Sequence, residues 1–580
     1  MVSDAPALEH RRHTLAHLLA AAMKELYPAA KPTIGPAVDN GFYYDFDTSD
    51  VKEADLAKIE KKMRQLLPAW KEFTHETVTA DKARAVFKDN PYKIEIIDEL
   101  EREGAAITLY ACGGFTDLCR GGHAEHPAKE ISPDSFKLDR IAGAYWRGDE
   151  KNEMLTRIYG LAFERKDELD AYLAQREEAA KRDHRKLGKE LDLFLTSELV
   201  GSGLPLWTPR GTIVRTELDR YVWELREKHG YQRVTIPHIT KKDLYETSGH
   251  WAKFSDELFR ISTREGKEYA LKPMNCPHHA QIFARKPHSY REMPQRYAET
   301  TMVYRDEQSG ELGGLTRVLS ITQDDSHVFC RHSQVRDEYF KIWDIVDTFY
   351  AAFGFTLRVR LSFHDPKTPE KYLGTPEIWQ AAESALRSIA EEREADFFEA
   401  PGEAAMYGPK LDFMATDSMG REHQVATIQL DMNQPERFDL SCINEKGERE
   451  RVVMIHCAIM GSIERFSAVL IEHLGGALPL WLSPVQVAVL PVSEKHAVYA
   501  QETLAQLIGS GIRAELSADE SLGKRIRGVK TMKVPYFLVL GDDEVAGKTA
   551  TLEGRAGKVG TLPLTELTAK LQEEIRTRAM

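Results

Sequence analysis

Residues 304–329 read YRDEQSGELGGLTRVLSITQDDSHVF. Arg305 and Glu307 open this stretch, and a glycine-rich loop separates them from a β-rich run that leads to His327. His327 follows the polar run TQDDS inside what is predicted to be ordered structure, so it is a candidate functional residue.

The sequence around this stretch, from about residue 205 to 482, alternates amphipathic helices with β-rich runs. Helical spacing is clear over 215–228, whereas 357–362 and 452–455 are typical of strands. Beyond residue 482 come VQVAVLPV, a helix near 499–508, IRAELS, a further helix and PYFLVLG. This alternation predicts a small α/β domain with a largely parallel sheet.

The first 175 residues mix helical patterns at 13–26 and 54–67 with short β-like runs and glycine-rich turns. Residues 171–194, AYLAQREEAAKRDHRKLGKELDLF, are rich in Glu, Lys, Arg and Ala, which predicts a solvated helix that connects domains. The expected organisation is a first domain at 1–175, a helical linker at 176–199, a central domain at 200–482 and a last domain at 483–580.

Bulk composition limits the classes of protein. A chain of 580 residues is too long for one core, and 42% hydrophobic with 29% charged residues is typical of a soluble globular protein. The net charge of −13 argues against a coat of nucleic acid but leaves room for a local basic face. The N-terminus resembles neither a signal peptide nor a membrane span, and six scattered cysteines fit a reducing compartment, so we expect a cytoplasmic protein without a membrane partner.

Cys276 lies in LKPMNCPHH (271–279), and His456 lies in VVMIHCAIMGSIERF (452–466). With His327, this thiol and these imidazoles offer three zinc ligands and leave a fourth position open for water or substrate. The residues alone leave two alternatives. Free cysteine often packs as a small hydrophobe, and 20 histidines permit many other combinations.

A second cluster stands near the N-terminus. His13 and His17 are one helical turn apart, and Cys119 and His123 share DLCRGGH (117–123). These four residues suggest either a closed zinc site or ordinary buried and surface residues. A metalloprotease is remote, because Thr14 follows His13 where the HExxH motif has glutamate.

Several motifs together resemble a known family. Residues 304–329 resemble motif 2 of class II aminoacyl-tRNA synthetases, 454–466 resemble motif 3, and GYQRVTIPHI (230–239), with Pro237, resembles motif 1. With KPMNCP, SGHW, TQDD, MYGPKLDF and TIQLD in the same order, essentially the whole chain is similar to the threonyl-tRNA synthetase family. The resemblance implies an α+β multidomain fold: a class II antiparallel sheet flanked by helices, an N-terminal α+β editing domain and a C-terminal α/β anticodon-binding domain.

The implied reaction joins threonine and ATP to threonyl-adenylate and then transfers threonine to tRNA(Thr). ATP is expected with Mg²⁺. The positions that match the family's ATP-binding residues are Arg305, Glu307, Arg317 and Arg465. The positions that match its catalytic residues are Arg305, Arg465, Gln323 and His250, the last at the ribose hydroxyl of the tRNA.

The resemblance also implies one Zn²⁺ per subunit, held by Cys276, His327 and His456. Its open position would take the amino and hydroxyl groups of threonine together. The residues expected around the substrate are Asp325, Tyr407, Gln424 and Gln429.

Serine carries the same two groups, so hydrolytic editing of seryl-tRNA(Thr) is expected. The resemblance places this activity, without a metal, at His13, His17, Lys93, Asp117, Cys119 and His123. Glu544, in GDDEV, matches an anticodon-reading position, and motif 1 implies a homodimer.

The sequence departs from the family pattern at His278, Leu319, Ile321, Cys457 and Leu552. It also begins at the editing domain, without the small β-rich domain that usually precedes it in bacterial members. Two alternatives therefore stay open: a paralogue altered for another role such as inhibitor resistance, and a non-catalytic protein that senses amino acid or RNA.

Overall fold

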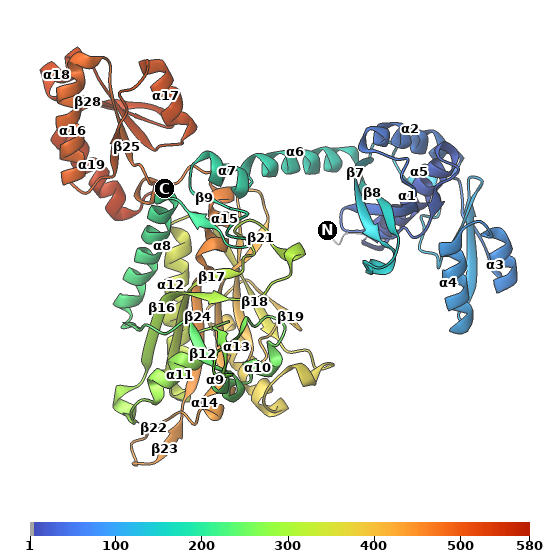
Figure 1. Cartoon of the computed structure of the whole chain (residues 1–580), viewed down its shortest axis with the longest axis horizontal. Helices are drawn as coiled ribbons and strands as arrows, with labels where there is room; N and C mark the ends of the chain where they lie inside the picture. The colour runs from blue at the N-terminus through green and yellow to red at the C-terminus, as the bar shows by residue number, and fades with distance from the viewer. Residues whose placement is uncertain (1–4) are drawn as a thin grey trace. The chain divides into compact units, whose positions relative to one another are not determined.

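The computed structural model describes residues 5–580, which form two compact units, one ending at Glu178 and one beginning at Ala179. Figure 1 shows the elements of both units. None of the helices within 5–580 has the length and hydrophobicity needed to cross a bilayer.

The first unit is built around α1 (Ala5–Leu26), whose alanines and leucines from Leu15 to Met23 are buried against a five-stranded antiparallel sheet and α2 (Leu56–Leu66). The strands of this sheet are β1 (Lys31–Pro32), β2 (Ala37–Val38), β3 (Gly41–Asp47), β7 (Phe136–Tyr145) and β8 (Met154–Ala162). A smaller layer combines a three-stranded sheet with two helices: β4 (Thr74–Val78), β5 (Ile107–Cys112), β6 (Phe115–Leu118), α3 (Ala80–Val86) and α4 (Pro91–Arg102). The expected α+β character of this segment is confirmed.

The centre of the second unit is an eight-stranded sheet that is antiparallel except for one parallel pair at each edge. In spatial order its strands are β11 (Gln232–Arg233), β16 (Gln295–Tyr304), β17 (Ser320–Cys330), β24 (Val453–Ser462), β21 (Glu422–Asp431), β20 (Lys410–Thr416), β18 (Thr356–Phe363) and β19 (Phe397–Pro401). The predicted antiparallel sheet flanked by helices is confirmed, and residues 304–329 run from the last residue of β16 through a loop into β17.

The helices that share the main core with this sheet include α8 (Pro209–Lys228), α12 (Val335–Ala351), α13 (Pro376–Glu392) and α15 (Ile463–His473). α8 begins where the Thr208 side chain accepts from the N–H of Gly211, and α15 begins where the Ser462 hydroxyl accepts from the N–H of Arg465 at 3.2 Å. The second cap places Arg465 in the first turn of α15.

The linker differs from the predicted single solvated helix. The chain forms α6 (Lys166–Arg182) and α7 (His184–Glu190), broken at Asp183. The Asp183 carboxylate accepts from the N–H of Arg185 at 2.8 Å and so caps α7, whose His184 and Leu187 are buried. Composition predicted helix here but not the break, because the cap needs only one aspartate.

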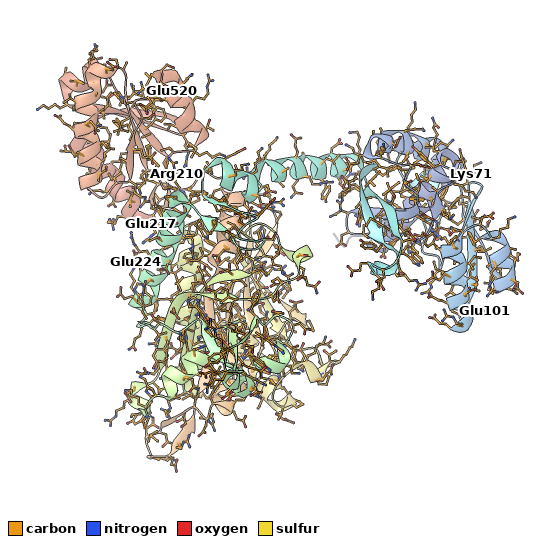
Figure 2. All side chains as sticks on the ribbon, viewed as in Figure 1. Lys71, Glu101, Arg210, Glu217, Glu224 and Glu520 are labelled. Atoms are coloured by element: carbon orange, nitrogen blue, oxygen red, sulfur yellow. The ribbon has the colours of Figure 1, made fainter. Side chains whose placement is uncertain are left out.

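The C-terminal sheet is mixed. β25 (Val487–Pro491) pairs parallel with β26 (Ala514–Leu516) and β27 (Tyr536–Leu540), as predicted, whereas β28 (Thr549–Gly554) and β29 (Gly557–Pro563) add antiparallel strands. Its helices are α16 (Ala497–Gly509), α17 (Leu522–Thr531), α18 (Asp542–Gly547) and α19 (Leu564–Thr577). Arg210, Glu217 and Glu224, labelled in Figure 2, lie along α8 and pair with Glu515, Arg513 and Arg578 of this segment.

Candidate functional site

The structure brings Cys276, His327 and His456 together. Their ligand atoms all lie within 4.8 Å of one another and all three side chains are buried. The two histidines are direct partners across the β17–β24 antiparallel pair, and Cys276 is the first residue of α11 (Cys276–Ala284). The register of β17 and β24 thus pairs the two histidines, and the first residue of α11 adds the thiol from a distant part of the chain.

Two further residues, which the sequence analysis missed, orient these ligands. Nε2 of His456 lies 2.8 Å from Oδ2 of Asp431, and Nδ1 of His327 lies 2.7 Å from Nδ1 of His279. The facing nitrogens, Nε2 of His327 and Nδ1 of His456, are 3.0 Å apart. His279 and Asp431 stand in the quoted motifs LKPMNCPHH and TIQLD, but nothing in those letters shows which way a side chain points.

The donor set fits a divalent cation. When the outer nitrogens of His327 and His456 carry the protons, two lone pairs face each other, an arrangement that a cation stabilises. Burial holds the pKa of His327 well below its ordinary value, so the ring is neutral as a ligand must be. Burial also raises the pKa of the Cys276 thiol, with the charges of Asp325 and Asp431 adding to the rise, so a thiolate here needs a cation beside it.

Three of the four predicted substrate residues, Asp325, Tyr407 and Gln429, lie beside this cluster. The Asp325 carboxylate accepts from the Asn275 amide at 2.9 Å and is 14% exposed. The Tyr407 ring stacks on His456 with centroids 4.8 Å apart, and its hydroxyl donates to Gln429 at 2.7 Å.

Gln424 lines the cleft but is already engaged in hydrogen bonds. Its amide bonds Arg360 at 2.7 Å and Asp412 at 3.0 Å, so in this structure its contacts lie within the sheet.

A cleft of about 430 Å³ runs beside the cluster. Its lining includes all the predicted ATP and catalytic residues except His250, namely Arg305, Glu307, Arg317, Gln323 and Arg465. Within the described residues neither Arg305 nor Arg465 pairs with a carboxylate, so both cations are available to an anionic ligand. Arg317 differs, because it pairs with Glu307 at 2.6 Å and Glu311 at 3.2 Å.

His250 is fully buried at the start of α10 (His250–Lys253). Its Nδ1 lies 2.7 Å from the Ser248 hydroxyl, which itself donates to the Tyr245 carbonyl at 3.2 Å. Nδ1 therefore donates, and Nε2, which has no partner among the described residues, is left as an acceptor. Burial lowers the pKa of His250 to about 3, and the charges of His456, Arg305 and Arg437 act in the same direction.

The residues that depart from the family pattern lie outside the ligand set. His278 is buried and bonds the Thr240 hydroxyl at 2.7 Å, and Cys457 points into the core on the strand face opposite His456. Ile321 lines the cleft, and the N–H of Leu319 donates to Gly203 at 2.8 Å. Leu552 is fully buried in the C-terminal core, so its side chain does not face a ligand.

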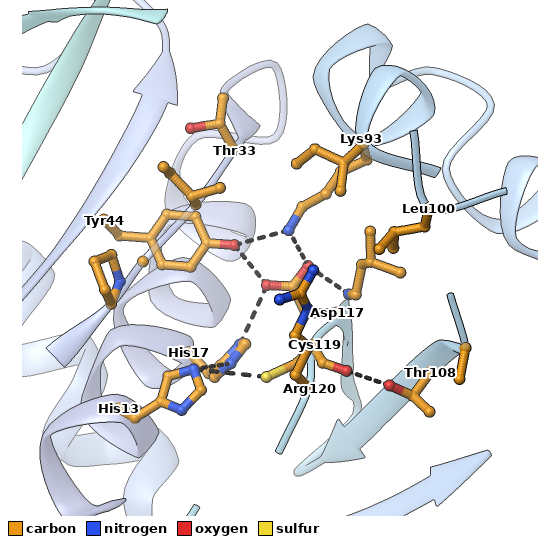
Figure 3. A pocket seen from close by; sticks show the side chains of 16 residues that line it. His13, His17, Thr33, Tyr44, Lys93, Leu100, Thr108, Asp117, Cys119 and Arg120 are labelled. Carbon is orange, nitrogen blue, oxygen red and sulfur yellow. Dashed lines mark hydrogen bonds and ion pairs between the residues drawn. The ribbon is translucent and has the colours of Figure 1, made fainter. Parts of the chain in front are cut away.

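In the first unit, five of the predicted editing residues, His13, His17, Lys93, Asp117 and Cys119, line one pocket of about 310 Å³ (Figure 3). The sixth, His123, contacts Cys119. Lys93 and Asp117 form a buried ion pair at 2.5 Å, and His17 lies 3.2 Å from the same carboxylate. The Tyr44 hydroxyl, also missed, donates to Asp117 at 2.5 Å. Tyr44 lies in the strand run GFYYDF, where the alternation of β3 gives the only signal.

The second half of this cluster centres on Cys119. Its sulfur lies 3.6 Å from Nε2 of His13 and 3.5 Å from Nε2 of His123. Burial opposes ionisation, but hydrogen bonds from His123, His13 and His17 lower the pKa of Cys119 to about 3. Burial likewise opposes protonation of His17, yet Asp117 and Cys119 raise its pKa to about 9.

Opposite charges therefore alternate through the pocket. The four His and Cys ligand atoms lie within 4.8 Å of one another, which is also the donor set of a closed metal site. The absence of a metal here stays a prediction.

Glu544 caps α18. Its two oxygens accept from the N–H of Gly541 at 2.9 Å and from the Thr551 hydroxyl at 2.6 Å. A role in reading the anticodon stays a prediction.

Comparison with known proteins agrees with this layout. Three family models match the chain: "Threonyl and Alanyl tRNA synthetase second additional domain" at 107–159, "tRNA synthetase class II core domain (G, H, P, S and T)" at 259–474 and "Anticodon binding domain" at 486–574. The threonine–tRNA ligase of Gloeobacter violaceus is 47% identical over 99% of this chain and 94% of the relative. That of Deinococcus radiodurans is 45% identical over 98% and 89%.

Among solved structures, the RNA binding domain of threonyl-tRNA synthetase from Cryptosporidium parvum is 38% identical, with a TM-score of 0.64, and the match covers 67% of this chain and 98% of that one. Identity of this extent, along nearly the full length of the relatives, shows the family. The chain belongs to the threonine–tRNA ligases, class II aminoacyl-tRNA synthetases that combine a class II core, an anticodon-binding domain and the editing domain shared with the alanyl enzymes.

Proposed function

We propose that this protein joins threonine to tRNA(Thr) in two steps. Threonine and ATP first give threonyl-adenylate and pyrophosphate, and the 3' end of the tRNA then accepts the threonyl group. The first step brings a carboxylate against the α-phosphate, two anions that repel each other. Arg305 and Arg465, the two cleft arginines for which the described part of the chain supplies no carboxylate partner, hold these anions together, and Gln323 assists at the carboxylate.

Glu307 and Arg317 complete the ATP site once their own ion pair opens. The Glu307 carboxylate accepts from the adenine amino group, and Arg317 holds the outermost phosphate. The remaining charge of the triphosphate requires Mg²⁺, which arrives with ATP. In the transfer step the free Nε2 of His250 accepts the hydrogen bond of the ribose hydroxyl.

Selectivity for threonine is assigned to Zn²⁺ bound by Cys276, His327 and His456, which would offer an open position to an amino and a hydroxyl group together. An apolar pocket alone separates a hydroxyl from a methyl group by no more than about 100-fold. Asp325 accepts from the substrate hydroxyl. Tyr407, fixed by Gln429, helps to hold the amino group, while Gln424 orders the cleft wall.

Serine passes this first selection because it has the same two groups and is smaller. The pocket of the first unit provides the second sieve. Lys93 and Asp117 hold the ester end of seryl-tRNA, and His13, His17, Cys119 and His123 position the attacking water. The thiolate of Cys119 and the imidazolium of His17 fix the orientation of that water without a metal.

One observation supports the proposal most. A buried Cys–His–His cluster adjoins, through Gln429, a cleft with two arginines that have no carboxylate partner among residues 5–580. Threonine-dependent exchange of pyrophosphate into ATP tests it. Threonine and serine should support exchange and valine should not. Cys276→Ala should lose both zinc and exchange. Zinc-loaded wild-type protein without threonine-dependent exchange would refute the enzymatic activity.

Metal analysis tests the second site independently. One zinc per chain is expected, and two would show that the His13 cluster holds a metal.

The homodimer, supported by motif 1 at 230–239, is tested by the mass of the protein in solution. A cytoplasmic location is supported by the six cysteines, all free among the described residues.

The two alternatives are not favoured. The changed positions leave the zinc ligands and both phosphate-handling arginines in place, which a sensor does not need. Exchange without charging of tRNA(Thr) would favour the altered paralogue, whereas loss of both activities would favour the sensor.

A further inference from the structure

His184 lies at the break between α6 and α7 and is buried, with 5% of its surface exposed. Its side chain contacts two elements of the proposed active site that are far apart in the chain. One is α15, whose first turn carries Arg465. The other is the loop between β16 and β17, which carries Arg317.

The contacts of His184 define its protonation. Nδ1 and the backbone N–H of His184 lie 2.7 Å and 3.1 Å from Oε1 of Glu472, in the last turn of α15. Nε2 lies 3.1 Å from the backbone nitrogen of Leu315. Because that N–H can only donate, Nε2 accepts, the ring is neutral, and Nδ1 donates to Glu472. Both ring nitrogens are satisfied, so His184, Asp183 and Glu472 need no metal although their ligand atoms lie close together.

The loop is shaped to receive this imidazole. The N–H of Thr316 donates to Gly313 at 2.9 Å and that of Gly313 to Arg317 at 3.2 Å, which turns the Leu315 N–H away from the cleft. A Cβ added to Gly314 would lie 2.3 Å from Nε2 of His184, and the φ of Gly314 is +58°, so glycine is required there. The back of the loop therefore packs on His184, while Thr316 and Arg317 line the cleft on its front.

We propose that His184 is a positioning residue for ATP. It fixes the β16–β17 loop against the end of α15, so that Arg317 and Arg465 face the same triphosphate. The inference rests on the proposed function, and it makes α7, near the start of the second unit, part of the active-site framework. The same network continues from Glu472 to Arg421 at 2.6 Å, which ties the loop to the turn between β20 and β21.

Two substitutions test the roles of the two ring nitrogens of His184 separately. The amide of His184→Gln reaches the position of Nε2 and keeps an acceptor for the Leu315 N–H. The amide of His184→Asn reaches only the position of Nδ1 and keeps the bond to Glu472. In pyrophosphate exchange, His184→Asn should raise the KM for ATP about tenfold, since one hydrogen bond that holds the loop is lost, and leave the KM for threonine within about twofold. His184→Gln should stay within about threefold of wild type for both substrates.

The chain offers a matched control. His364 bonds Glu383 through Nδ1 at 2.7 Å and through its backbone N–H at 2.9 Å, the same clamp, but it contacts no part of the β16–β17 loop. His364→Asn should lower thermal stability without changing the KM for ATP. An unchanged KM for ATP in His184→Asn, equal rises for both substrates, or a glutamine variant no better than the asparagine one would each overturn the inference.

A measurement on the wild type covers the case in which the variants fail to fold. The Leu315 amide should be protected from hydrogen exchange, unlike the exposed amide of the nearby Gly310. Hydrogen exchange at the Leu315 amide as fast as at the Gly310 amide would refute the hydrogen bond between Leu315 and His184. Hydrogen exchange does not depend on enzymatic activity. A wild-type protein that fails in the pyrophosphate-exchange assay would therefore count against the proposed function alone.

Discussion

Nε2 of His456 donates to Oδ2 of Asp431 at 2.8 Å, and this contact fixes which nitrogen of the ring faces His327. The other oxygen of Asp431 accepts from the N–H groups of Asn433 and Gln434 at 2.8 and 2.9 Å, so the carboxylate itself cannot rotate. A carboxylate behind a metal-binding histidine sets both its tautomer and its basicity. We therefore expect Asp431 to strengthen the proposed zinc binding although it offers no ligand atom to the ion.

Asp431→Asn should weaken zinc binding about 10- to 100-fold, because the new NH₂ would face Nε2 and favour the tautomer that protonates Nδ1. Competition with a chelator measures the affinity. Asp417→Asn is the control, because Asp417 also accepts from backbone N–H groups and bonds a histidine, His423, at 2.9 Å, away from the Cys276 cluster. Equal zinc affinity in the Asp431 variant and wild type would contradict the assignment.

His13→Ala should leave threonine activation unchanged and let seryl-tRNA(Thr) accumulate. The partners of His13 in this cluster, His17 and Cys119, both belong to the first unit, whereas the proposed activation site belongs to the second. Hydrolysis of preformed seryl-tRNA is the measurement. His10→Ala, one helical turn earlier and exposed, is the matched variant and should hydrolyse at the wild-type rate. If both variants hydrolyse seryl-tRNA equally well, the editing assignment is lost.

The sequence predicts the zinc ligands and the cleft arginines because motifs record residue types that the chemistry requires. His279, Asp431 and Tyr44 could not be predicted, because their roles depend on side-chain directions set by tertiary packing. The break between α6 and α7 at Asp183 could not be predicted from composition either. It depends on one capping residue within a segment whose other residues favour helix. His184 stood in a run whose composition indicated a solvated surface, so only the contacts with Glu472 and Leu315 show its burial.

The transfer step should not lose rate as the pH falls from 8 to about 6. An ordinary histidine with a pKa near 6.5 gains a proton across this range and ceases to accept. Burial lowers the pKa of His250 to about 3, so its Nε2 stays unprotonated well below pH 6. Single-turnover transfer from preformed threonyl-adenylate measures the profile, with His250→Gln as the slow reference. A wild-type rate that halves near pH 6.5 would show that His250 titrates normally.

Arg317 should contribute to ATP binding only after its guanidinium leaves the carboxylate oxygens of Glu307 and Glu311 and binds phosphate oxygens. In this structure it is 48% exposed and bound to Glu307 and Glu311, whereas Arg305 and Arg465 are already available. Because phosphate oxygens replace carboxylate oxygens, the net gain is smaller than that of a new ion pair, and Arg317→Ala should raise the KM for ATP about tenfold rather than abolish exchange.

Arg336 provides the comparison for this last change. It also pairs with two carboxylates, Asp337 and Glu392, and its side chain is half-exposed on α12, outside the lining of the cleft. Arg336→Ala should leave the KM for ATP unchanged, which separates loss of a phosphate contact from loss of a surface ion pair. Glu311→Gln should lower the KM for ATP slightly, because it removes one competitor for the guanidinium and leaves Glu307 in place for adenine. A KM that rises in Glu311→Gln would mean that the pair organises the loop for ATP instead of competing with it.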